Sequence, residues 1–132
     1  MILVDTSAWI EFLRGTGSAV ALKVRSSIAS GEVATTDPVM LEVISGAHSD
    51  QVVSQRRLLH TVDFLPQHTR DDVLHAADLY RHCRDRGVTI RSLTDCLIAA
   101  IAIRNDVALL HAERDFDRLA EHTRLRCVVP QA

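Results

Sequence analysis

The stretch that decides the fold stands at the start of the chain and reads Met1-Ile2-Leu3-Val4-Asp5-Thr6-Ser7. Residues 2–4 are apolar without polar alternation, which is typical of a short strand buried on both faces of a parallel sheet. Three polar residues, 5–7, follow this strand at once. In open parallel sheets, binding sites lie at the carboxyl ends of the strands. The stretch therefore predicts a buried strand and a polar site at its end.

The rest of the chain alternates further apolar runs with helical patterns. Runs 107–110 and 127–129 resemble the first strand, and 33–35 and 62–65 are weaker strand candidates. Helical periodicity covers 7–14, 19–30, 38–47, 50–60, 69–86, 94–105 and 116–121. Asp37 before Pro38 indicates a helix N-cap, and Gly87 indicates a helix end. Strands alternating with helices predict an α/β three-layer sandwich, with helices on both faces of a mostly parallel sheet.

Length and composition favour one globular domain, 1–132. The 132 residues suffice for one core, and the chain is 47% hydrophobic and 24% charged. A net charge of −2 gives no overall signal for nucleic acid, so any such contact must be local. The three cysteines lack the paired spacing of a disulfide framework or zinc site, so we expect reduced thiols. Neither a secretion signal nor a membrane span is evident, which favours the cytoplasm.

Acidic residues follow or begin several of these elements. Asp5 follows the first apolar run, and Glu113 and Asp115 follow the run ending at residue 110. Asp95 lies in the first turn of a very apolar helix, so its carboxylate is expected to point out of the core. Glu42 stands on the small-residue face of a helix that otherwise looks buried on several sides. We expect these five acids to meet at one edge of the sheet.

Such a cluster indicates hard-metal chemistry. Neighbouring carboxylates repel one another unless a cation neutralises them or some stay protonated. Oxygen ligands suit Mg²⁺ or Mn²⁺, which bind phosphates and activate water as a nucleophile. The predicted reaction is hydrolysis of a phosphodiester bond.

Helix capping is the main alternative for the same residues. Residues 5–7 could cap the first helix, and Ser92-x-x-Asp95 matches a capping box. Singly, Glu42 is more often a solvated helix residue, and Glu113 and Asp115 are more often polar turn residues. The expected joint placement at one sheet edge favours the metal-site interpretation over these separate ones.

Four stretches together resemble the PIN domain family, and within it the VapC toxins of bacterial VapBC toxin–antitoxin pairs. They are residues 2–9, the helix around Glu42, residues 95–100 and Asp115-Phe116-Asp117. The resemblance spans nearly the whole chain. It implies a Mg²⁺- or Mn²⁺-dependent endoribonuclease toxin, with Asp5, Glu42, Asp95 and Asp115 as catalytic and metal-binding acids. Thr6 or Ser7 would supply a hydroxyl near the metal.

The resemblance also implies partners, and the sequence departs from it at two positions. A homodimer, a VapB-type antitoxin and an RNA substrate, preferentially transfer RNA, are expected, with no membrane. Glu113 stands where the family has aspartate, and its longer side chain could coordinate, directly or through water, or could lie outside the immediate ligands of the metal. His111 stands where a small hydroxyl residue is common. Arg14, Arg91, Arg114 and Arg118 flank the acidic segments and are candidates for binding RNA phosphates.

Other activities fit less well. A dehalogenase-type phosphatase needs aspartate where Ser7 stands, and a receiver domain needs a late lysine, whereas the single lysine is Lys23. The seven histidines form no H-x-x-x-H pair, which disfavours a metal-free histidine ribonuclease. A catalytically inactive PIN-type module that binds RNA or protein remains the alternative from another functional class.

Overall fold

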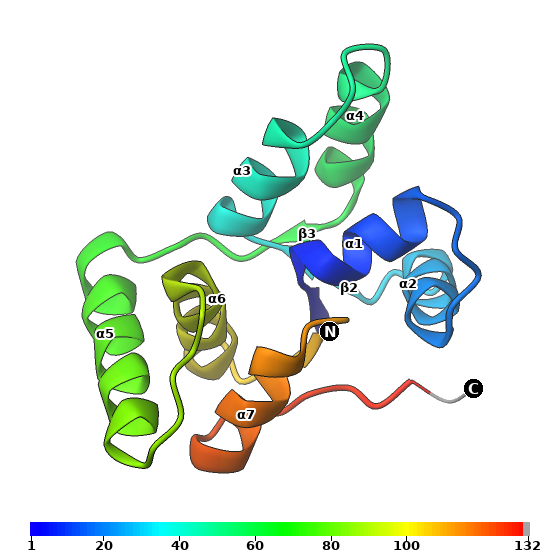
Figure 1. The fold of residues 1–132 in the computed structure, drawn as a ribbon. Coiled ribbons are helices and arrows are strands. Elements are labelled where there is room, and N and C mark those ends of the chain that lie inside the picture. The colour runs from blue at the N-terminus through cyan, green and yellow to red at the C-terminus, as the bar shows by residue number, and fades with distance from the viewer. Residues whose placement is uncertain (131–132) are drawn as a thin grey trace.

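The computed structural model describes residues 1–130 and folds them around a four-stranded sheet (Figure 1). The strands are β1 (Ile2–Val4), β2 (Val33–Thr35), β3 (Asp63–Phe64) and β4 (Ala108–Leu110). The helices are α1 (Thr6–Leu13), α2 (Ala19–Ala29), α3 (Asp37–Ser45), α4 (Val52–Thr61), α5 (Thr69–Asp85), α6 (Leu93–Arg104) and α7 (Arg114–His122). These elements match the predicted alternation to within a few residues at each end.

The sheet has the order β3-β2-β1-β4, and all its strands are parallel. Ile2 of β1 pairs with Val33 on one side and with Ala108 on the other, so β1 is a central strand. Beyond the strand, the Asp5 N–H donates to the Leu110 carbonyl at 2.9 Å. This bond fixes the carboxyl ends of β1 and β4 side by side, where the acidic residues follow.

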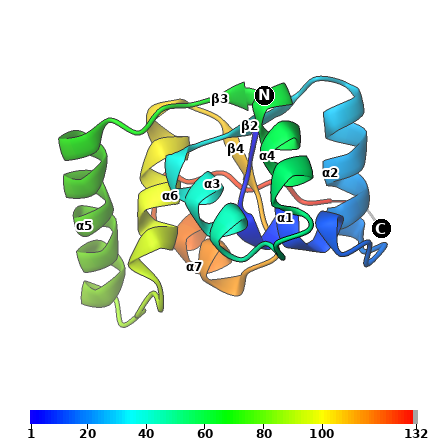
Figure 2. The ribbon, with the colours of Figure 1, turned by 90° about the horizontal axis from the view of Figure 1, so that it is seen from above.

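Helices cover both faces of the sheet, as predicted. α5 and α6 lie on one side, and α1 and α2 lie on the other (Figures 1 and 2). The middle of α6 is apolar and enclosed, and Ile98 through Ala102 have no exposed surface. With 12 residues, α6 is too short to span the hydrocarbon core of a bilayer, which takes about 20 residues. Within residues 1–130, no helix combines the length and apolarity needed to cross a membrane.

The prediction of a strand at 127–129 was wrong. This segment runs beside β4 but forms a single parallel bridge, between Leu109 and Cys127. Two backbone bonds support the bridge: Leu109 N donates to Arg126 O at 2.9 Å, and Val128 N donates to Leu109 O at 2.8 Å. Pro130 follows with no N–H to donate, so the ladder does not extend. The segment nevertheless holds Cys127 close to β4.

The sequence predicts an N-cap at Asp37 and a helix end at Gly87. The first prediction was wrong and the second was confirmed. The N-cap of α3 is Thr36, and Asp37 is the first helical residue. The Asp37 carboxylate instead accepts a hydrogen bond of 2.7 Å from the Gln67 N–H, 30 residues along the chain, which local sequence does not reveal. Gly87 follows the end of α5 with φ of +81°, a left-handed conformation that glycine adopts without strain.

Candidate active site

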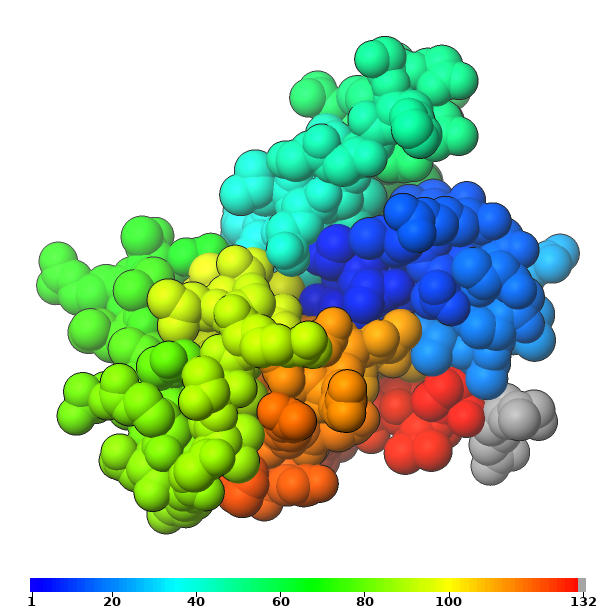
Figure 3. All heavy atoms as spheres, viewed as in Figure 1, coloured from blue at the N-terminus to red at the C-terminus, as the bar shows by residue number. Residues whose placement is uncertain are grey.

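Four segments meet on one face of the molecule, around a recess in its surface. They are the end of β1, helix α3, the start of α6 and the connection from β4 to α7 (Figure 3). Each segment carries at least one of the predicted acids. Asp95 feels the negative charge of the other four, in decreasing order Asp5, Glu113, Glu42 and Asp115. The structure therefore brings the five predicted acids into one neighbourhood.

Asp5 is buried, with 3% of its surface exposed. Its Oδ2 accepts hydrogen bonds from the Ser7 N–H at 2.9 Å and the Ser7 hydroxyl at 2.6 Å. Its Oδ1 is buried and has no hydrogen-bond partner among the described residues. Burial raises the pKa of Asp5 above 3.8, and the bonds from Ser7 only partly offset this. A buried carboxylate oxygen without a partner is costly, so Oδ1 calls for a proton or a cation.

Thr6 and Ser7 connect the segments around Asp5. The Thr6 hydroxyl donates to Glu42 Oε1 at 2.8 Å and so ties α3 to the start of α1. The Ser7 hydroxyl, which donates to Asp5, also accepts from the Ala112 N–H at 2.9 Å. These hydroxyls therefore fix two acids and the β4–α7 connection relative to one another.

Asp95 lies half-buried in the first turn of α6. Burial, together with the four neighbouring acids, raises its pKa from 3.8 to about 7. Without a cation, this carboxyl therefore keeps its proton to a much higher pH than an ordinary aspartate does. A titration so far from the ordinary range is typical of functional sites.

Glu113 and Asp115 have a different environment, because both contact Arg91. The Arg91 guanidinium donates to Glu113 Oε1 at 2.6 Å and to Asp115 Oδ2 at 3.2 Å, and the Arg91 N–H donates to the same Oδ2 at 2.9 Å. Asp115 is 2% exposed, and its burial alone would raise its pKa. The bonds and charge of Arg91, with a smaller contribution from Arg118, instead hold the pKa of Asp115 below 3.8.

The site thus divides into two groups. We call Asp5, Glu42 and Asp95 the open carboxylates, because within residues 1–130 none of them forms an ion pair. We call Glu113 and Asp115 the arginine-paired carboxylates. The five acids do not form a closed cage in this conformation: in the described chain, three ligand atoms come within 4.8 Å of one another only at His111, Asp117 and Cys127.

Comparison with known proteins identifies the family. The model of the PIN domain matches residues 2–122. The chain is 41% identical over 131 residues to a VapC ribonuclease of Mycobacterium bovis and to the ribonuclease VapC11 of Mycobacterium tuberculosis, covering 96% of this chain and of each relative.

This chain belongs to the VapC family of PIN domains. The same fold occurs in FitAcB from Neisseria gonorrhoeae, with a TM-score of 0.75, 20% identity and 98% of both chains covered. It also occurs in a toxin–antitoxin complex from Klebsiella pneumoniae, with a TM-score of 0.71, 19% identity and coverage of 99% of this chain and 98% of that one. At these identities the two structures show the fold alone.

The capping interpretation explains some acids of this PIN domain and not others. Asp5 caps α1 through Oδ2, and Glu113 caps α7 by accepting from the Asp115 N–H at 3.4 Å. The capping box at the start of α6 does not form, because the N-cap Ser92 makes no side-chain capping bond. Capping therefore accounts for neither Asp95 nor the unpartnered oxygen of Asp5.

Glu42 lies on the wall of a cleft, and its helix is less buried than its sequence indicates. The cleft has a volume of about 480 Å³ between α1 and the α3–α4 pair, and Arg14 lies on it as well. Leu41, expected to pack inside, is 70% exposed, because α3 projects from the body of this PIN domain (Figure 1). An apolar pattern on a helix does not reveal whether another element covers it.

The four predicted phosphate-binding arginines of this PIN domain lie at different points around the site. Arg14 borders the cleft beside Glu42, and Arg114 borders a depression beside Glu113. Arg118 lies 3.8 Å from Asp115 Oδ1. Arg91 pairs with two acids, yet its side chain is 66% exposed, so its guanidinium is partly accessible.

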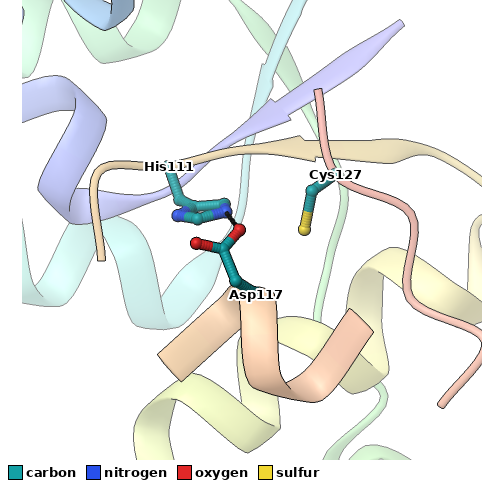
Figure 4. Close-up of side chains that lie close together, drawn as sticks. All are labelled: His111, Asp117 and Cys127. Atoms are coloured by element: carbon teal, nitrogen blue, oxygen red, sulfur yellow. Dashed lines mark ion pairs between the residues drawn. The ribbon is translucent and has the colours of Figure 1, made fainter. Parts of the chain in front are cut away.

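Sequence reasoning missed one group of side chains in this PIN domain. His111 pairs with Asp117 at 3.2 Å, and Cys127 lies beside them (Figure 4). Cys83, Cys96 and Cys127 are free thiols, of which the first two are buried and Cys127 is half-buried. In the sequence, only the unusual His111 could have indicated this group of side chains. The approach of Cys127 depends on the 127–129 segment lying beside β4, which the sequence does not reveal.

Proposed function

We propose that this protein is a divalent-metal-dependent endoribonuclease, the toxin of a toxin–antitoxin pair. The observation that carries the proposal is the open carboxylates: Asp5 has a buried oxygen without a partner, beside Asp95, whose pKa is raised to about 7. This concentration of negative charge without a basic partner fits a cation site. The ribonuclease names of the 41% identical relatives supply the reaction class.

The donor set fits Mg²⁺ or Mn²⁺. Asp5 and Asp95 would hold the ion, with Glu42 and Asp115 as further ligands and Glu113 acting directly or through water, and these are oxygen donors of the kind that such ions prefer. When bound, such an ion supplies Lewis acidity and lowers the pKa of water, the chemistry that phosphodiester hydrolysis needs.

The other residues of the site keep these acids in place. Ser7 holds one oxygen of Asp5 and leaves the other free, and Thr6 holds Glu42. Arg91 orients Glu113 and Asp115 through three hydrogen bonds. Such fixed geometry lowers the cost of arranging the reacting groups. We further propose that Arg14, Arg91, Arg114 and Arg118 bind RNA phosphates around the recess.

The same proposal extends to substrate and partners. Transfer RNA is the proposed substrate, because proteins read RNA sequence mostly in loops, and its cleavage in the cytoplasm would inhibit translation. A VapB-type antitoxin is the proposed inhibitor, supported by the shared fold of the Klebsiella pneumoniae toxin–antitoxin complex. A homodimer is the proposed assembly.

The decisive experiment is RNA cleavage by purified, antitoxin-free protein. Transfer RNA and total RNA are incubated with Mg²⁺ or Mn²⁺, and with excess EDTA, and the new RNA ends are sequenced. We expect cleavage at defined sites with either metal and none with EDTA. Undiminished cleavage in EDTA would overturn the metal-dependent mechanism. RNA binding without cleavage under every condition would instead support an inactive RNA-binding module.

A further inference from the structure

A second group of potential metal ligands lies next to Glu113, one of the arginine-paired carboxylates. His111 follows β4, Asp117 lies in α7, and Cys127 belongs to the segment that runs beside β4 (Figure 4). One ligand atom from each of these residues lies within 4.8 Å of the other two. His111 Nε2 and Asp117 Oδ1 are 3.2 Å apart. The three side chains converge from segments up to 16 residues apart in sequence.

The fold fixes the three residues from the backbone outward. Cys127 is held by its parallel bridge to Leu109, two residues before His111. The His111 ring packs against Phe116, with ring centres 5.2 Å apart, and Phe116 is the residue before Asp117. Only side-chain adjustment is therefore needed to bring the three donors around one ion.

The donor types identify the ion. Thiolate and imidazole are soft or intermediate ligands, which suit Zn²⁺ and disfavour Mg²⁺. We propose that His111, Asp117 and Cys127 form a zinc site with three protein ligands and one open position. The group is accessible, since Asp117 is 65% exposed and, with His111, lines a surface depression of about 460 Å³. None of its three residues is a ligand of the proposed magnesium or manganese site, so this proposal does not rest on that one.

Occupancy of the site has two consequences for its surroundings. Burial and the nearby Asp117 raise the pKa of the Cys127 thiol to about 11, so ion binding must displace a proton. His111 Nδ1 accepts a hydrogen bond of 3.1 Å from the Glu113 N–H, whereas coordination through Nε2 leaves the ring proton on Nδ1. Zinc must therefore break this bond to Glu113. The lost thiol proton and the broken hydrogen bond both weaken zinc binding, so we expect it to be reversible. The broken bond also couples zinc binding to the N-terminus of α7.

Cobalt binding to the reduced, antitoxin-free protein tests the proposal. Co²⁺ replaces Zn²⁺ in such sites and gives a thiolate-to-cobalt absorption band. We expect one equivalent of Co²⁺ to produce this band, Zn²⁺ to abolish it and excess Mg²⁺ to leave it. C127S should lose the band, and H111N and D117N should weaken Co²⁺ binding at least about tenfold. Asp117 is exposed, so D117N is the variant least able to disturb folding.

Two matched controls separate this site from the proposed active site. Cys83→Ser removes a buried thiol elsewhere and should keep the band, as should Asp95→Asn, which alters only the open carboxylates. Absence of the band from the wild type, or its persistence in folded C127S, would overturn the proposal. Loss of the band in Asp95→Asn would also overturn it, because the ion would then belong to the active site. None of these outcomes bears on RNA cleavage.

Discussion

Asp95 and Asp115 are two aspartates in the first turns of neighbouring helices, yet their surroundings shift their pKa values in opposite directions. Burial and four acidic neighbours raise the pKa of Asp95 to about 7. Asp115 is more deeply buried, but hydrogen bonds and charge from Arg91 keep its pKa below 3.8. Burial therefore does not decide the charge of an acid; the presence of a basic partner does.

The same contrast separates the open carboxylates from the arginine-paired ones as groups. The charge of the arginine-paired carboxylates is already partly balanced by Arg91. The open carboxylates lack such a partner, so their mutual repulsion is available to stabilise a bound cation. The contrast predicts that substitutions in the two groups affect stability in opposite directions and differ in their dependence on metal.

The largest expected effect is on catalysis by the open carboxylates. Asp5→Asn and Asp95→Asn should each lower RNA cleavage by about a hundredfold or more, because each removes a charged oxygen from the proposed ion site. Both substitutions are nearly isosteric, so the fold should remain intact by circular dichroism. Cleavage of a labelled RNA in Mg²⁺ or Mn²⁺ provides the measurement.

Asp85→Asn is the matched control, because Asp85 is an exposed aspartate at the end of α5. It should cleave RNA at the wild-type rate. If folded Asp95→Asn also cleaved RNA at the wild-type rate, Asp95 would have no role in the reaction. The division into open and arginine-paired carboxylates would then not correspond to a difference in function.

The next effect is on thermal stability, where Asp95 and Asp115 should behave as opposites. Without metal, Asp95→Asn should raise Tm because it relieves repulsion, whereas Asp115→Asn should lower Tm because it removes a buried partner of Arg91. Metal at about a hundred times its Kd should stabilise the wild type by roughly 2.7 kcal/mol, or several degrees. Asp95→Asn should lose most of this gain. Thermal melts of the wild type and both variants, in EDTA and in Mg²⁺ or Mn²⁺, measure the metal-free Tm changes and the Tm rise that metal causes.

A wild-type Tm that stays constant up to tens of millimolar metal would contradict the assignment of the open carboxylates as an ion site. A metal-free Asp95→Asn that melts below the wild type would show that the carboxylate of Asp95 stabilises the fold, as a helix cap does.

The sequence reveals those parts of this arrangement that depend on local pattern. The apolar run before Asp5 and the apolar helix after Asp95 show where each acid emerges, because strand ends and helix starts are local features. The pairing of Arg91 with Asp115 joins residues 24 apart and depends on how α6 and α7 pack. The exposure of Leu41 and the approach of Cys127 to His111 depend equally on tertiary contacts. The sequence therefore indicates which acids gather but not which of them have a basic partner.

The pH dependence of stability offers a further test of the comparison. For Asp95, the folded protein holds a proton that the unfolded chain releases between about pH 4 and pH 7, so wild-type stability falls as pH rises through this window. The metal-free Tm advantage of Asp95→Asn should therefore grow from pH 4 to pH 7 and then level off. For Asp115 the sign is reversed: the Tm deficit of Asp115→Asn should be full at pH 7 and shrink below about pH 4. Parallel trends in the two variants would contradict the assigned shifts.

The smallest expected effect comes from removing the basic partner itself. Arg91→Gln should slightly lower the metal-free Tm, because Glu113 and Asp115 lose their counter-charge. The substitution also removes the positive partner that Glu113 and Asp115 share, so these two acids then resemble the open carboxylates more closely. Because one positive charge near the ion is removed, we expect metal to bind roughly two- to tenfold more tightly. Titration of Tm with Mn²⁺ gives the apparent affinity. Arg25→Gln is the matched control, since Arg25 is exposed on α2 and forms no ion pair within residues 1–130, and it should leave the affinity unchanged. Equal affinities in Arg91→Gln and wild type would show that Arg91 does not compete with the cation, and that the two groups act independently.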